Sequence, residues 1–137
     1  MKKHNHKTYA VVSCYLLGSL LLIGGLAALG SVFLLRPVSS DDYFASLSLG
    51  MLVTGSEYCI LAALCFWSAR TLAKQTRKAT SIAAVTLSLV GVADCWDLFR
   101  DIQTGLSVVG VISFVLIAIL LAVILTYLLQ SKHEAVA

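Results

Sequence analysis

The segment Tyr9–Leu35 reads YAVVSCYLLGSLLLIGGLAALGSVFLL and contains no charged residue. Its apolar residues follow one another continuously, whereas a lipid-facing β-strand would alternate apolar and polar positions. About 20 helical residues already cross a hydrocarbon core about 30 Å thick. The segment therefore predicts a membrane-spanning α-helix, since backbone groups in lipid must find their hydrogen bonds within their own segment.

The rest of the chain repeats this pattern. Of its 137 residues 59% are hydrophobic and 12% are charged, and the mean hydropathy is +0.92. Soluble proteins are about half apolar and a quarter charged, so this composition excludes an ordinary soluble domain. We predict a single integral membrane domain over residues 1–137, all-α, in which four helices form an up-down-up-down bundle. Its spans cover roughly residues 9–35, 43–69, 79–98 and 106–129.

Basic residues are distributed unevenly around these spans. The two tails and the middle loop carry eight: Lys2, Lys3, Lys7, Arg70, Lys74, Arg77, Lys78 and Lys132. The other two loops carry only Arg36 and Arg100. The positive-inside rule then predicts that both termini are cytoplasmic. The expected partner is the lipid bilayer. A nucleic-acid partner is not expected, because the sequence outside the spans has no stripe of basic and aromatic residues.

Small residues recur four positions apart, a spacing that allows helices to approach closely in lipid. The pairs are Gly24 with Ala28, Ala27 with Ser31, Ser46 with Gly50, and Ala84 with Ser88. We expect them to pack inside the bundle, with docking of another subunit as the alternative.

Glu57 is the most informative single residue. It lies about 13 positions from either end of the second span, near the bilayer midplane. An ionised carboxylate there costs about 3 kcal/mol on insertion scales, so a partner must compensate it. Asp94 lies roughly 24 Å into the third span from the cytoplasmic side, and Glu57 roughly 20 Å from the same side. The two carboxyls are therefore close enough in depth to face each other, and if they do, they share a proton.

Asp97 and Asp101 continue the helical face of Asp94 at offsets of three and seven. With Glu57 they form a candidate proton, cation or ligand site, for which Arg36 and Arg100 are candidate counter-ions. Two interpretations stay open. Glu57 is either such a site or a protonated side chain bonded within the bundle, and the aspartates are either its outer mouth or a solvated helix end with an Asp97–Arg100 pair.

The cysteines and histidines do not indicate a redox enzyme or a haem protein. The four cysteines, Cys14, Cys59, Cys65 and Cys95, all fall inside predicted spans without a C-x-x-C pair. Small apolar core positions explain them better than a disulfide-forming enzyme does. The histidines lie only in the tails, whereas a haem between membrane helices needs an axial ligand within a span. We predict no catalytic residue, no metal site and no cofactor.

Several residues support a resemblance in layout to a known family. They are the Gly50–Gly55 stretch leading into Leu61-Ala62-Ala63-Leu64, basic residues at Arg70 and Arg77, Gly91-x-x-Asp94, and Gly105. In these the chain resembles the small DoxX-like four-helix membrane proteins of bacteria, and the resemblance implies that it lies in the inner (plasma) membrane. That resemblance implies an accessory role, since some such proteins are subunits of quinone-linked oxidase or thiosulfate-oxidising complexes. Glu57 lies outside the shared pattern.

The sequence thus favours a small accessory or interaction protein that is not an enzyme. A larger membrane complex or a second copy of the chain would be its partner. The alternative is a proton-coupled transport or ligand-binding module that uses the Glu57/Asp94 carboxyl pair.

Overall fold

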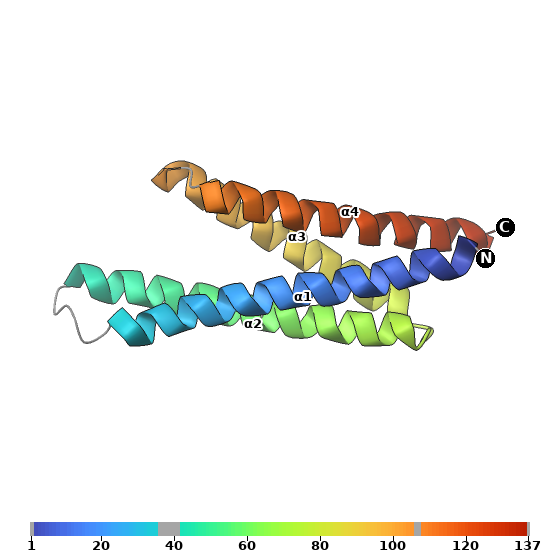
Figure 1. The fold of residues 1–137 in the computed structure, drawn as a ribbon, viewed down its shortest axis with the longest axis horizontal. Helices are drawn as coiled ribbons and strands as arrows, with labels where there is room; N and C mark the ends of the chain where they lie inside the picture. The colour runs from blue at the N-terminus through green and yellow to red at the C-terminus, as the bar shows by residue number, and fades with distance from the viewer. Residues whose placement is uncertain (1, 36–41, 106–107, 137) are drawn as a thin grey trace.

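The computed structural model describes residues 2–35, 42–105 and 108–136, with side chains for residues 7–34, 48–105 and 108–133. Its elements are α1 (Lys2–Leu35), α2 (Asp42–Ala73), α3 (Ala79–Thr104) and α4 (Val108–Val136). Both termini and the turn at 74–78 lie at one end of the bundle, which we call the N/C end (Figure 1). The opposite end is the far end. The predicted all-α four-helix bundle with up-down-up-down order is confirmed.

Each helix contains a stretch long and apolar enough to cross a membrane. These stretches are Lys7–Leu34, Ser48–Ala73, Ala79–Thr104 and Val108–His133. Large apolar side chains such as Ile23, Val92 and Val109 are more than 60% exposed, which suits lipid and not water. The chain is therefore a multi-pass membrane protein.

Several helix ends extend beyond the apolar runs, and two of them show why. The helix α3 continues six residues past Leu98, through Arg100 and Asp101 to Thr104. Charged residues end an apolar run, but they are compatible with helical backbone. What ends α3 is Gly105, whose φ of 105° lies in the left-handed region that favours glycine. Likewise α1 begins at Lys2, before the apolar run that starts at Tyr9.

Among the four helices, α1 and α2 pack against each other most extensively. A Cβ atom built on Gly25 would lie 2.9 Å from the carbonyl oxygen of Gly55 and 2.9 Å from the Cys59 Sγ. Only glycine leaves room for this contact, which we call the Gly25–Gly55 seam. The expected small-residue pairs contribute less. Gly50 has no neighbour within 4 Å of its Cβ position, and Ala84 is exposed.

The two helix pairs are held together mainly in the half of the bundle near the N/C end. There the buried hydroxyls of Ser68 on α2 and Thr86 on α3 share a hydrogen bond of 2.8 Å. Leu17, Leu72 and Val90 belong to the apolar core and are almost completely buried. Toward the far end the α3–α4 pair separates from the α1–α2 pair (Figure 1).

Candidate functional site

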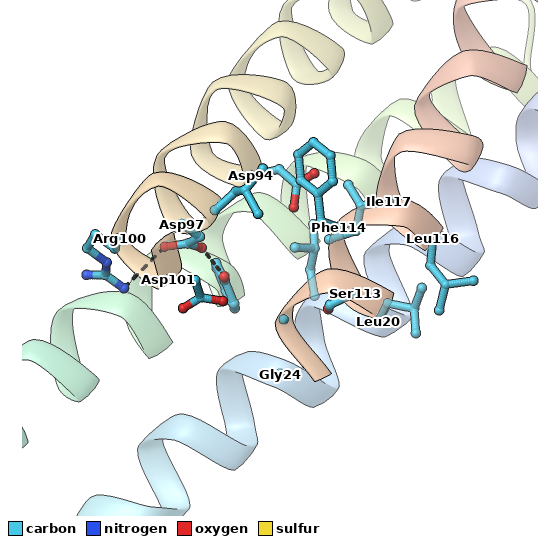
Figure 2. A pocket seen from close by; sticks show the side chains of 14 residues that line it. Leu20, Gly24, Asp94, Asp97, Arg100, Asp101, Ser113, Phe114, Leu116 and Ile117 are labelled. Carbon is cyan, nitrogen blue, oxygen red and sulfur yellow. Dashed lines mark hydrogen bonds and ion pairs between the residues drawn. The ribbon is translucent and has the colours of Figure 1, made fainter. Parts of the chain in front are cut away.

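All four helices enclose a cavity of about 210 Å³ in the far half of the bundle. We call it the acidic cavity, because Asp94, Asp97 and Asp101 line it from one side of α3 (Figure 2). Their offsets of three and seven place them on one helical face, as the sequence spacing predicts. Arg100 of the same helix lines it as well.

The opposite wall of the acidic cavity is largely apolar. The helix α1 contributes Leu20 and Gly24, and α4 contributes Ser113, Phe114 and Ile117 (Figure 2). Polar and apolar chemistry therefore face each other across one small space. Sites for small organic molecules combine an apolar lining with a few polar groups in this way.

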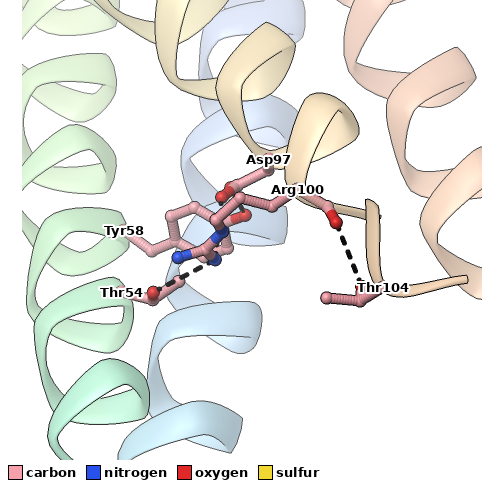
Figure 3. Close-up of polar contacts among 5 residues, drawn as sticks. All are labelled: Thr54, Tyr58, Asp97, Arg100 and Thr104. Carbon is pink, nitrogen blue, oxygen red and sulfur yellow. Dashed lines mark hydrogen bonds and ion pairs between the residues drawn. The ribbon is translucent and has the colours of Figure 1, made fainter. Parts of the chain in front are cut away.

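Asp97 uses both of its oxygens within the protein. The Tyr58 hydroxyl on α2 donates a hydrogen bond to Oδ2 of Asp97, and Arg100 Nη2 lies 3.2 Å from Oδ1 (Figure 3). Arg100 also donates a hydrogen bond of 3.4 Å to the Thr54 hydroxyl. The Asp97–Arg100 ion pair considered from the sequence is thus present, and Asp97 links α3 to α2.

Asp94 and Asp101 differ from Asp97 in this respect. Both side chains are half-buried at the cavity wall. Within the part of the chain that the structure describes, neither carboxyl makes a hydrogen bond or an ion pair. Their oxygens are therefore free to bind a ligand from the cavity. The described residues contain no group of three His, Cys, Asp or Glu side chains arranged to hold a metal ion.

No family model matches this chain, and comparisons with curated proteins and with solved structures find no match either. The DoxX-like resemblance stays a prediction, and the assignment of the site depends on its geometry.

Glu57 does not join the aspartates. Its side chain is exposed on the outer surface of α2 and is not among the residues that line the acidic cavity. It makes no hydrogen bond or ion pair with another described residue, so the Glu57–Asp94 pair of the alternative hypothesis is not formed. The reason is rotational. Tyr58, the next residue, faces α3, and consecutive helical residues point about 100° apart.

The candidate counter-ions and the cysteines are the remaining residues singled out from the sequence. Arg36, the other candidate counter-ion, lies outside the described residues, whereas Arg100 is in the cavity wall. Cys14 and Cys65 are buried as expected for core positions, but Cys95 is exposed. All four cysteines are free.

Sequence reasoning missed Thr54 and Tyr58, the α2 residues that contact the Asp97–Arg100 pair. A signal was present, because they lie four positions apart and so share one helical face. Tyr58 also lies mid-span, away from the interfacial positions where tyrosine is commonly found in membrane helices. A tyrosine hydroxyl away from water normally has a hydrogen-bond partner, and that requirement pointed to a polar group on a neighbouring helix.

Proposed function

We propose that this chain is a membrane-spanning binding protein for a small organic cation, held in the acidic cavity, with no reaction of its own. The observation that carries the proposal is the pair of carboxyls, Asp94 and Asp101, that line the cavity and have no partner among the described residues. A carboxylate at membrane depth is costly when unpaired, and a bound cation compensates it.

The charge of the site supports a cation. Asp97 and Arg100 neutralise each other as an ion pair. Asp94 and Asp101 then leave two formal negative charges on the cavity wall when both are ionised. Opposite charges attract more strongly in a water-poor site than in water, so a cation gains more here than at the surface.

The size and the apolar wall support an organic cation of few atoms. Pockets for drug-sized ligands have volumes of about 300–1,000 Å³, and the acidic cavity at about 210 Å³ is smaller. Phe114 contributes an aromatic ring to the wall opposite α3. Cations bind to the faces of aromatic rings. A primary or quaternary amine with a short apolar substituent therefore suits both walls.

The test is equilibrium binding of benzylammonium to the purified protein in detergent micelles, measured by calorimetry. We expect Asp94→Asn to weaken binding between about tenfold and a hundredfold, since hydrogen bonds to charged groups contribute about 1.5–3 kcal/mol. Glu57→Gln is the matched control, because it removes an acid at similar depth outside the cavity, and it should bind as the wild type does. Equal binding by Asp94→Asn and the wild type would refute the proposal, as would equal binding of neutral benzyl alcohol.

A second candidate function, an accessory or interaction protein within a larger membrane complex, is favoured by Glu57. Its exposed carboxyl would face lipid in a lone monomer, which costs free energy. A neighbouring protein that supplies a hydrogen-bond donor would remove this cost. Glu57→Gln should then lose a partner that co-purifies stoichiometrically in mild detergent. A lone monodisperse wild-type species argues against this role. Proton-coupled transport is less well supported, because Glu57 and Asp94 do not line one path.

The basic residues at the N/C end support cytoplasmic termini. The DoxX-like layout supports the inner (plasma) membrane of a bacterium. In that orientation the acidic cavity lies in the half of the bundle away from the cytoplasm. A cation would then enter from outside the cytoplasm.

A further inference from the structure

Two apolar grooves flank α3 on the outer surface of the bundle, in the half near the N/C end. The α2–α3 groove has a volume of about 460 Å³, and its floor and walls include Leu64, Val85 and Leu89. The α3–α4 groove has a volume of about 450 Å³, and Leu125 and Leu129 are among its lining residues. Both face the region that the hydrocarbon of the bilayer occupies, so they are open to acyl chains.

Each groove carries a lysine at the N/C end. Lys78 lines the α2–α3 groove together with Ser81, and Lys132 lines the α3–α4 groove together with Thr80 and Ser131. Neither ammonium group has a hydrogen-bond or ion-pair partner among the described residues. Lys7, at the same end of the bundle, differs because its Nζ donates a hydrogen bond of 3.0 Å to the carbonyl oxygen of Ala73.

The dimensions of the α2–α3 groove match one leaflet. From Lys78 to Leu89 the helix α3 rises about 16 Å at about 1.5 Å per residue. Half of a hydrocarbon core about 30 Å thick is about 15 Å. An acyl chain lying in this groove would therefore end near the bilayer midplane while its headgroup stays level with Lys78.

The start of α3 between the two lysines is also suited to negative charge. Its first turn has no side-chain cap and no acidic residue. Among the described backbone contacts there, the N–H groups of Ala79 and Ile82 bond to carbonyl oxygens of Thr76 and Lys78. The partial positive charge at a helix N-terminus adds to that of the lysines.

We propose that the two grooves hold the acyl chains of anionic phospholipid, whose phosphate binds Lys78 and Lys132. The apolar walls fit any phospholipid, so it is the two lysines that select a lipid with net negative charge. Basic pockets between membrane helices bind anionic headgroups by this combination of contacts. The inference is independent of the acidic cavity, which lies in the other half of the bundle.

The test uses full-length protein depleted of lipid in detergent, to which dioleoyl phosphatidylglycerol or dioleoyl phosphatidylcholine is added. Lipid binding is measured by native mass spectrometry and by the shift of the thermal unfolding midpoint. We expect phosphatidylglycerol to bind more tightly and to raise the midpoint further. Lys78→Gln and Lys132→Gln should each weaken its binding about fivefold, the effect of one lysine near an anionic headgroup.

The matched control is Lys74→Gln, which removes the same charge from the same turn but does not line either groove. It should bind phosphatidylglycerol as the wild type does. Equal binding of the two lipids would overturn the proposal, and so would an equal loss in Lys74→Gln. An equal rise of the midpoint with inorganic phosphate alone would also overturn it, since the acyl chains would then be irrelevant.

Discussion

Substitution of Gly25 by alanine tests the contact on which the arrangement of α1 and α2 depends. The new Cβ atom would lie 2.9 Å from the Gly55 carbonyl oxygen, a backbone atom that cannot rotate away. The two helices must therefore separate slightly along the Gly25–Gly55 seam. Overpacking of this kind costs about 1–3 kcal/mol.

Helix propensity does not offset this cost. In water, glycine is about 1 kcal/mol less favourable than alanine within a helix. Membrane helices, however, stay largely helical in the detergent-unfolded state. The higher helix propensity of alanine therefore stabilises the folded and the unfolded state equally. We expect Gly25→Ala to lower the free energy of unfolding by about 1–3 kcal/mol. The assay is titration from a mild detergent into sodium dodecyl sulfate, followed by the fluorescence of Trp67 and Trp96.

The control is Gly30→Ala on the same helix, because nothing lies within 4 Å of its Cβ position. Its free energy of unfolding should stay within about 0.5 kcal/mol of the wild-type value. If Gly25→Ala is as stable as Gly30→Ala, then α1 and α2 do not approach at the seam and the arrangement derived from it is wrong.

Two further predictions concern the site and the orientation. Tyr58→Phe removes the hydroxyl that bonds to Asp97 and should lower the free energy of unfolding by about 0.6 kcal/mol in the same titration, the average for hydrogen bonds between membrane helices. Tyr15→Phe is the control. Equal stability of the two variants would mean that the Tyr58–Asp97 hydrogen bond is not formed. In a background without native cysteines, a membrane-impermeant maleimide added to intact cells should label Gln103→Cys at the far end but not Thr76→Cys in the turn at the N/C end, because the basic residues favour a cytoplasmic turn. Labelling of Thr76→Cys alone would reverse the orientation, and labelling of both would contradict a single one.

The number and order of the helices could be predicted because membrane spans are the strongest signal a sequence contains. Each apolar run must be helical, and short connections make consecutive helices antiparallel neighbours. The grouping of Asp94, Asp97 and Asp101 was also predictable, since all three lie on one helix and local spacing decides which face they share. Such features depend on residues close together in the chain.

Contacts between helices were harder to predict, and the small-residue pairs show why. Ala84 and Ser88 have the spacing that allows close approach, but they line a lipid-facing groove instead. In lipid, both the packed and the exposed faces of a helix are apolar, so the sequence pattern around a span barely distinguishes them. The Gly25–Gly55 seam depends on two helices fitting together, which neither segment shows alone.

For Glu57 the sequence predicts the depth in the membrane but not the direction in which the side chain points. Its depth follows from counting residues, but its direction is set by the face of α2 that packs on α1. Gly55 lies in the seam, and Glu57, two residues later, points about 200° away around the helix, nearly opposite. Tyr58 points about 60° from Gly55 in the reverse sense, toward α3 and Asp97.

One rotation of α2 therefore decides two features of the site. Turning Glu57 into the acidic cavity would require α2 to rotate by about 100°, which would carry Gly55 out of the seam and Tyr58 away from Asp97. The Glu57–Asp94 pair and the Tyr58–Asp97 hydrogen bond are thus alternatives that exclude each other. As long as Gly25 and Gly55 are in contact, the carboxyls available to a ligand in the cavity are Asp94 and Asp101, and Glu57 is available only to a neighbour on the outside of the bundle.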